Sequence, residues 1–125
     1  LHDPRLSSLG ESQAAKTNAL LLTLPKIELI VCSPLTRTLQ TYLLTYYHLV
    51  QSSKLPAVPL IIHPDVQEVC HNPCDVGRPI EELKRDFPMF NEELERFRTT
   101  FGDEEWRIKD RLESFYHPDR IEERA

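Results

Sequence analysis

A short apolar run that leads directly into a helix start is the feature that most limits how this chain can fold. The run Ile27 to Cys32 reads Ile-Glu-Leu-Ile-Val-Cys, which is too continuous for a half-exposed strand and predicts a buried parallel strand. Ser33 and Pro34 follow at once, and serine at the N-cap with proline at the first helical position is typical of a helix start. Apolar residues at helical spacing then predict a helix over Leu35 to Val50.

Helices and strands also alternate in the flanking sequence. Ser8 and Glu11 fit a capping box, so a helix is expected from about Leu9 to Leu24, with Pro25 ending it. Leu60 to His63 reads as a second short strand. This alternation predicts an α/β fold.

The carboxyl half contains a long loop followed by helices. Proline and glycine punctuate His63 to Pro79, and long loops in compact domains are often functional. Asn91 is the predicted N-cap of a helix that Gly102 ends, and further helices are expected to open at Asp103 and at Pro118. The residues of the Asp103 helix expected to face inward are Ile108, Leu112 and Phe115.

Composition excludes several functional classes. The chain has 15 Lys and Arg against 20 Asp and Glu, a net charge of −5, so no basic field is available for nucleic acid. Its longest apolar runs are far shorter than the roughly 18 residues of a membrane span, and no membrane association is expected. With 3 glycines in 125 residues, it contains neither a dinucleotide-binding fingerprint nor a P-loop.

The 3 cysteines leave one thiol unpaired in any disulfide scheme, which favours either a reducing compartment or simply structural thiols, and a cytoplasmic location is the default expectation. Cys70, His71 and Cys74 raise the question of a zinc site, but their spacing does not match a Cys-x-x-Cys knuckle. We therefore expect no metal and no cofactor.

Arg37 is the strongest candidate for a binding residue. It lies in the first turn of a helix that begins at the carboxyl end of a buried strand, where α/β proteins bind anions. Its guanidinium group could hold a phosphate through two hydrogen bonds, or could equally form an ion pair with a neighbouring carboxylate.

Three segments resemble the histidine phosphatase superfamily, the phosphoglycerate mutase-like proteins. The string CSPLTRTLQT at 32–41 is similar to that family's S-P-L-x-R-x-x-Q-T segment, and DPRLSSLGESQA at 3–14 is similar to its D-P-x-L-T-x-x-G-x-x-Q-A segment. Val66 to Glu68, followed by PCDVG at 73–77, resembles the loop that carries its acid/base glutamate. The order and spacing look closest to the fungal branch of the family.

The resemblance implies a role for three residues. Arg37 would bind the phosphoryl oxygens, and Glu68 would protonate the leaving oxygen and then help to activate water. Without the resemblance, Glu68 would read as a solvated loop carboxylate. Ser33 is expected mainly to cap the helix, with contact to the phosphate second. The implied substrate is a phosphorylated small molecule or phosphoprotein.

The catalytic histidines of the family have no counterpart here. Its nucleophile belongs to an R-H-G motif before the D-P-x-L-T segment, and none of the 5 histidines precedes a glycine or follows an arginine. We therefore expect residues 1–125 to be one partial phosphoglycerate mutase-like domain, a three-layer α/β/α sandwich with a mostly parallel sheet that is incomplete at both ends.

Two functions remain open. The complete domain would hydrolyse phosphomonoesters or transfer phosphoryl groups through a phosphohistidine, this chain being inactive by itself. The alternative is a truncated non-catalytic relative that binds a phosphorylated ligand or a protein partner, for example in a fungal biosynthetic pathway. The oligomeric state is open. The apolar faces left by missing strands should make the segment marginally stable and prone to association.

Overall fold

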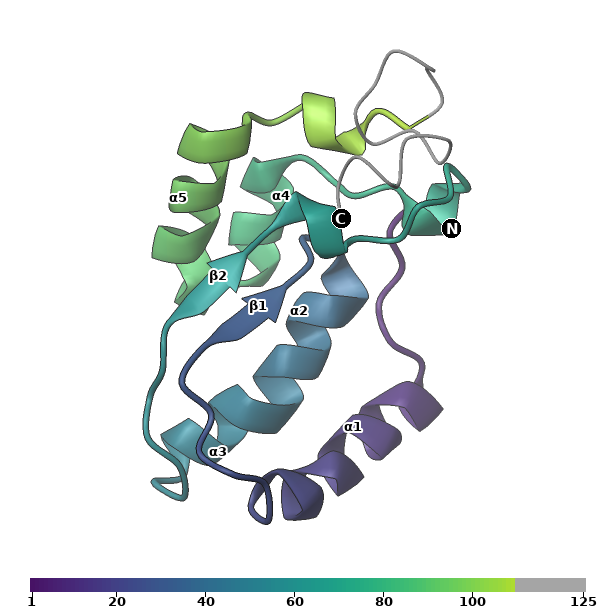
Figure 1. Ribbon diagram of the computed structural model, residues 1–125. Helices are drawn as coiled ribbons and strands as arrows, with labels where there is room; N and C mark the ends of the chain where they lie inside the picture. The colour runs from purple at the N-terminus through teal and green to yellow at the C-terminus, as the bar shows by residue number, and fades with distance from the viewer. Residues whose placement is uncertain (110–125) are drawn as a thin grey trace.

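The computed structural model describes residues 1–109. Its central unit is a strand, helix, strand crossover in which β1 (Ile30–Cys32) and β2 (Leu60–Ile62) pair in parallel. The register places Val31 opposite Ile61 (Figure 1). The predicted α/β class and the predicted parallel pairing are confirmed, and both strands are shorter than the sequence indicated.

The crossover is one helical rod with an irregular middle. It consists of α2 (Thr36–Tyr42), a π-helical segment, η1 (Leu43–Tyr47), and α3 (His48–Gln51). Thr45 Oγ1 donates to the Thr41 carbonyl oxygen at 2.6 Å, so a side chain competes for a carbonyl of the regular helix ladder. In α3, Leu49 is the buried residue, and Val50, which the sequence placed on the apolar face, is only partly buried.

The remaining helices flank this unit. α1 (Ser8–Leu21) packs along η1, and α4 (Ile80–Asp86) and α5 (Asn91–Phe101) pack on each other, with α5 also contacting β2. α4 lies where the sequence predicted no helix. Short 3-10 turns cover the residues η2 (Pro64–Val66), η3 (Pro73–Asp75), η4 (Pro88–Phe90) and η5 (Glu105–Arg107).

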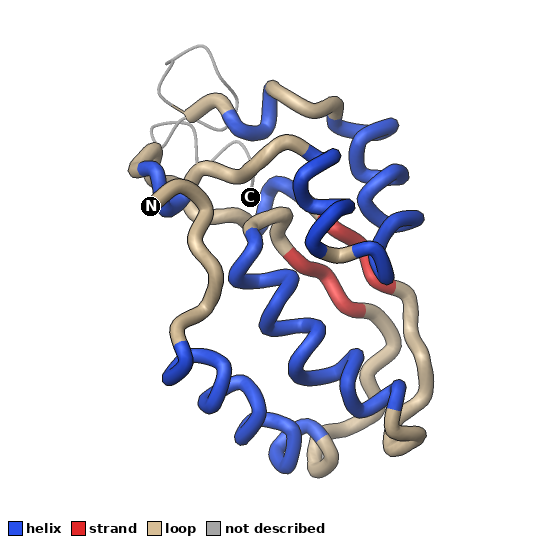
Figure 2. Tube along the Cα trace, turned by 180° about the vertical axis from the view of Figure 1, so that it is seen from behind, coloured by secondary structure: helices blue, strands red, loops and turns tan. Residues whose placement is uncertain are grey.

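The core lies between the strands and the helices. The views from opposite sides place the helices on one side of the strand pair (Figures 1 and 2). On the opposite face, Val31 and Ile61 are 48% and 42% exposed. The predicted exposure of apolar strand residues is thus found on this face. The buried residues of the main core cluster are Cys32, Leu39, Leu60, Ile62, Ile80, Leu83, Phe87, Phe90, Leu94, Phe97 and Trp106.

Three predicted helix caps are wrong. The side chain that caps α1 is Ser7, whose Oγ accepts from Gly10 N at 3.1 Å, and not Ser8. α2 begins at Thr36, three residues after Ser33, and its N-cap position, Leu35, provides no side-chain bond. Asn91 is the first residue of α5 and does not cap it.

The end of the described chain also differs from the prediction. Instead of an α-helix from Asp103, residues Glu105–Arg107 form a 3-10 turn, after which Ile108 is partly buried. The other predicted inward residues, Leu112 and Phe115, and the helix predicted at Pro118, lie outside the described residues.

Candidate phosphate site

Arg37 is held by the loop that follows β2. Its Nη1 donates to the Cys74 carbonyl oxygen at 2.6 Å, and its Nη2 donates to Asp75 Oδ1 at 2.9 Å. Glu68 Oε1 lies 4.0 Å from the same Nη2. The structure therefore brings the two predicted residues, Arg37 and Glu68, together. It also shows the ion pair that was the alternative reading of Arg37, with Asp75 as its main partner.

Burial differs among these charged groups in a way that suits binding. The side chain of Glu68 is 62% exposed, whereas those of Arg37 and Asp75 are mostly covered. Arg37 and Asp75 thus form a fixed pair, and the Glu68 carboxylate beside them is open to solvent.

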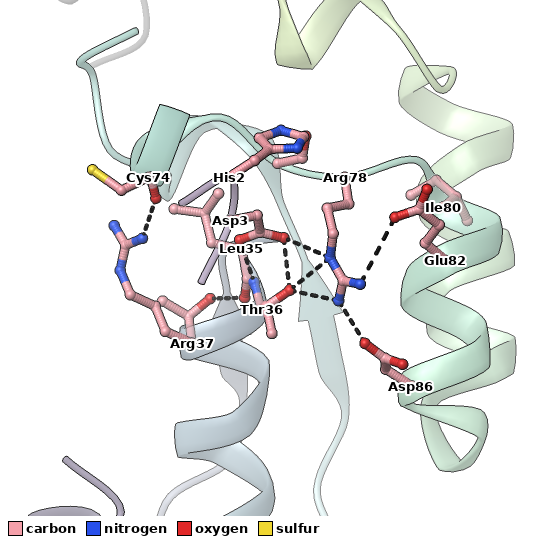
Figure 3. Close-up of polar contacts among 12 residues, drawn as sticks. His2, Asp3, Leu35, Thr36, Arg37, Cys74, Arg78, Ile80, Glu82 and Asp86 are labelled. Atoms are coloured by element: carbon pink, nitrogen blue, oxygen red, sulfur yellow. Dashed lines mark hydrogen bonds and ion pairs between the residues drawn. The ribbon is translucent and has the colours of Figure 1, made fainter. Parts of the chain in front are cut away.

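The amino end of α2 is occupied by a carboxylate of the chain itself. Asp3 Oδ1 accepts from Thr36 N at 2.9 Å, and Asp3 Oδ2 accepts from Thr36 Oγ1 at 2.6 Å (Figure 3). The sequence predicted that an anion would bind at this helix start, where the first backbone amides of a helix are free. For Thr36 N that prediction is wrong, because Asp3 already supplies the negative charge.

Arg78 completes this buried network. It donates to Asp3 Oδ2 through Nε at 3.3 Å, and to Thr36 Oγ1 and Asp86 Oδ2 through Nη2 at 2.8 Å and 2.7 Å. Burial acts to lower the pKa of Arg78, but its bonds to Asp86 and Asp3 outweigh that effect and raise it. Arg78 therefore remains a cation that neutralises Asp3 and connects α4 to the start of α2 (Figure 3).

Ser33 is buried behind the site. Its Oγ lies 2.7 Å from Thr38 Oγ1, which in turn donates to the carbonyl oxygens of Ser33 and Leu35. Ser33 thus fastens the turn between β1 and α2, although it does not cap the helix.

The neighbouring Cys32 is a poor nucleophile. Burial raises the pKa of its thiol to about 11, an effect that a hydrogen bond with Thr38 partly opposes. A thiol with this pKa is almost entirely protonated at neutral pH, and the thiolate is the reactive form.

The described histidines have different surroundings. His2 Nε2 donates to the Gly77 carbonyl oxygen at 3.1 Å, and His63 Nδ1 accepts from Asp65 N at 3.2 Å. His48 and His71 are exposed. Within residues 1–109, no three His, Cys, Asp or Glu side chains form a group that could hold a metal ion. In the same range, no helix has the length and apolar character needed to cross a membrane.

Sequence reasoning missed the residues that hold the site in place. Asp3 and Thr36 are 33 residues apart, and Arg37 and Asp75 are 38 apart, so no local spacing relates them. The only available signal was that Asp3 and Asp75 fall inside two of the segments that suggested the family.

Comparisons with known proteins give the family. The model of the histidine phosphatase superfamily, branch 1, matches residues 1–119. A probable phosphatase of the fission yeast Schizosaccharomyces pombe is 32% identical over 92 residues, which cover 72% of this chain. These residues span 41% of that relative's length, and no solved structure matches. The resemblance predicted from three motifs is confirmed, with a fungal protein among the relatives: the chain belongs to the histidine phosphatase superfamily.

Proposed function

We propose that this chain carries the phosphate-binding part of a phosphatase or phosphoryl-transfer domain, with Arg37 as the ligand of the phosphoryl group. The observation that carries the proposal is the way Arg37 is held. Two of the five N–H groups of its guanidinium donate to Cys74 and Asp75 within the described chain, which orients the group and leaves three for an anion.

Glu68 is the proposed proton donor. It lies 4.0 Å from Arg37 and is exposed, so a phosphate ester bound to Arg37 would meet its carboxyl group. In the first step it would protonate the leaving oxygen, and in the second it would take a proton from the attacking water. Ser33 is proposed to support the turn behind the phosphate.

The nucleophile of the complete domain is proposed to be a histidine from a segment with no counterpart in residues 1–109. The sequence lacks the R-H-G motif, and the matched region spans 41% of the yeast relative. The reaction would then be hydrolysis of a phosphomonoester, or phosphoryl transfer, through a phosphohistidine, with a phosphorylated small molecule or phosphoprotein as substrate.

The complete fold is proposed to be a three-layer α/β/α sandwich, of which residues 1–125 form part of one domain. The exposed Val31 and Ile61 support a further layer over that face of the strand pair. A cavity of about 350 Å³ borders β1 and is lined in part by Ile30, Val31 and Tyr42, which supports a further strand at this edge. The free thiols of Cys32, Cys70 and Cys74 support the proposal of a cytoplasmic location.

A second function follows from the same site without turnover. The orientation of Arg37 by Cys74 and Asp75 also suits a protein that binds a phosphorylated ligand or partner without hydrolysing it, for example in a fungal biosynthetic pathway. Binding and hydrolysis must therefore be measured separately.

The test is to titrate the chain with inorganic phosphate by calorimetry and to assay p-nitrophenyl phosphate hydrolysis at about pH 6. Arg37→Ala is expected to weaken phosphate binding by about tenfold or more, since a charge-assisted bidentate contact is lost. Arg98→Ala is the matched control, because Arg98 is also paired with carboxylates, Glu81 and Glu95, and lies outside the site.

The outcomes separate the two functions. Phosphate binding that depends on Arg37, without hydrolysis by this chain, agrees with both functions. The hydrolysis assay on a longer chain that carries an R-H-G segment then decides between them. Equal phosphate binding by Arg37→Ala and Arg98→Ala would contradict the proposed site. Hydrolysis by this chain itself would show that its own residues supply the nucleophile.

A further inference from the structure

Lys109 is a buried cation close to the candidate site. Lys109 is 1% exposed. Its Nζ donates to the Glu68 carbonyl oxygen at 2.6 Å and also to the Asp75 carbonyl oxygen. A buried ammonium group is costly unless it is hydrogen-bonded, so these contacts keep Lys109 in a defined position.

The two carbonyl groups lie at the two ends of one loop segment, 68–75. This segment carries the Glu68 carboxylate at one end, and at the other end it carries the Cys74 oxygen and the Asp75 carboxylate that hold Arg37. Lys109 therefore joins the part of the loop that presents Glu68 to the part that orients Arg37.

The loop has little regular structure of its own. Between its ends, Cys70, His71 and Asn72 are exposed, and the only helical turn is the short η3. Its shape within the described chain thus depends on contacts with other segments, and Lys109 makes two of them at once.

The residues just before Lys109 also contact this loop region. Gln67 Nε2 donates to the Trp106 carbonyl oxygen at 2.9 Å, and the Trp106 ring lies against Gly77. The segment 106–109 thus crosses the base of the loop and contacts both of its sides.

From these contacts we infer that Lys109 is a positioning residue for the phosphate site, acting through the 68–75 loop. The inference rests on the proposed function, since it assumes that Arg37 binds phosphate. Lys109 itself does not contact the phosphate. Its contribution is to keep the Cys74 and Asp75 acceptors where they orient Arg37, and to keep Glu68 beside them.

The first test compares Lys109→Met and Lys109→Arg with Lys84→Met. Lys84 is a suitable control because it is ion-paired with Glu81 and Glu95 between α4 and α5, away from the loop. Lys109→Met is expected to speed amide hydrogen exchange in residues 69–76 and to weaken inorganic phosphate binding by about fivefold, a typical coupling between linked sites. Lys109→Arg keeps the charge and the donors, and is expected to restore part of both.

A second measurement uses the unaltered chain, so the inference can still be tested if the Lys109→Met variant does not fold. By linkage, a loop that improves phosphate binding must itself be stabilised by phosphate. Saturating inorganic phosphate should therefore slow the acetylation of Lys109 by acetic anhydride, measured by mass spectrometry, and leave the rate at the exposed Lys54 unchanged.

The results distinguish the inference from the proposed function. If the unaltered chain does not bind phosphate, the proposed function fails and the inference with it. If phosphate binds but does not slow acetylation of Lys109, the inference alone is overturned. It is also overturned if a folded Lys109→Met binds phosphate as tightly as Lys84→Met. A loss of stability alone would lower the melting temperature without changing the phosphate affinity of the folded chain.

Discussion

The Asp3 carboxylate caps α2 through Thr36, a residue 33 positions further along the chain. Both carboxylate oxygens are used, one by the Thr36 amide and one by its hydroxyl group, and the Asp3 side chain is fully buried. Arg78 neutralises the charge from the other side. The start of the helix that carries Arg37 is therefore anchored by the amino-terminal segment.

Asp3→Ala is expected to lower the free energy of unfolding by about 2–4 kcal/mol, because it removes a helix cap and leaves Arg78 without one of its buried partners. Urea unfolding followed by circular dichroism measures this. Asp3→Asn is the matched variant, since Asn retains a cap oxygen and tolerates the positive φ of 44° at this position. It should lose less stability than Asp3→Ala, and equal losses would show that the charge is what matters.

Gly77→Ala is expected to destabilise the chain by about 1–3 kcal/mol through overpacking. A Cβ at this position would lie 2.4 Å from Trp106 Cζ3, and the fully buried indole has little room to move. Thermal unfolding detects the change, and Trp106 fluorescence reports the site directly. At Gly10, a Cβ would meet the flexible Leu6 side chain at 3.2 Å. Gly10→Ala should therefore be close to neutral, and a similar loss in both variants would refute the steric argument.

Asp75→Asn is expected to tighten inorganic phosphate binding by about two- to fivefold, because an anion beside Arg37 is removed while an oxygen acceptor for the guanidinium remains. Calorimetric titration measures the affinity. Asp65→Asn makes the same change in net charge in η2, outside the 68–75 segment, and its effect should be smaller. Weaker phosphate binding by Asp75→Asn would mean that the charge of Asp75 is needed to orient Arg37.

Cys32 is expected to make the chain less stable in alkali. Its folded-state pKa of about 11 lies above the ordinary thiol value of 9.0, so its contribution is complete below pH 9 and is lost as the pH rises towards 11. The loss has an upper limit of roughly 2–3 kcal/mol, at about 1.4 kcal/mol for each pKa unit.

Urea unfolding at about pH 8 and at about pH 10.5 tests this dependence. Cys32→Ala should be less stable than the unaltered chain at the lower pH, because of the cavity, and should lose less on going to the higher pH. Cys70→Ala, at an exposed thiol, should keep the full dependence on pH. If Cys32→Ala keeps it as well, another group is responsible, and the half-buried Tyr42, whose pKa is raised by desolvation to about 12, becomes the candidate.

The exposed strand face is expected to cause self-association. Val31 and Ile61 are neighbours in the strand register and are both about half exposed, so they form the centre of an apolar surface. The double variant Val31→Thr, Ile61→Thr should shift the chain towards monomer in sedimentation velocity at increasing concentration. A chain that is monomeric at all concentrations before the change would contradict the expectation.

Several elements were accessible from the sequence because the signal is local. The apolar run before Ser33, the helical spacing after it and the short strand at Leu60 each depend on neighbouring residues, and the resulting α/β crossover is found in the structure. The Arg37 motif was likewise readable, since its residues are contiguous. The expectation that Glu68 acts together with Arg37 came from the family resemblance and not from the spacing of the two residues.

Helix starts show where local reasoning fails. Ser8, Ser33 and Asn91 were all predicted to cap helices from within the sequence, yet α2 is capped by Asp3. The first amide of α4, at Ile80, is satisfied by Asp103 Oδ1 at 2.9 Å, 23 residues away. A helix amide is satisfied by any acceptor that reaches it, and a distant one leaves no pattern in the local sequence.

The sequence by itself thus determined the positions of both strands and of α1, α2 and α5, and which arginine follows the first strand, because these depend on periodicity and on adjacent residues. Only the tertiary structure decided what surrounds that arginine. Asp75 pairs with it, Asp3 fills the helix start that was expected to bind an anion, and Lys109 closes the loop that carries Glu68. The physical reason is that buried charges must find partners wherever the folded chain places them, and those partners lie more than 30 residues away along the chain.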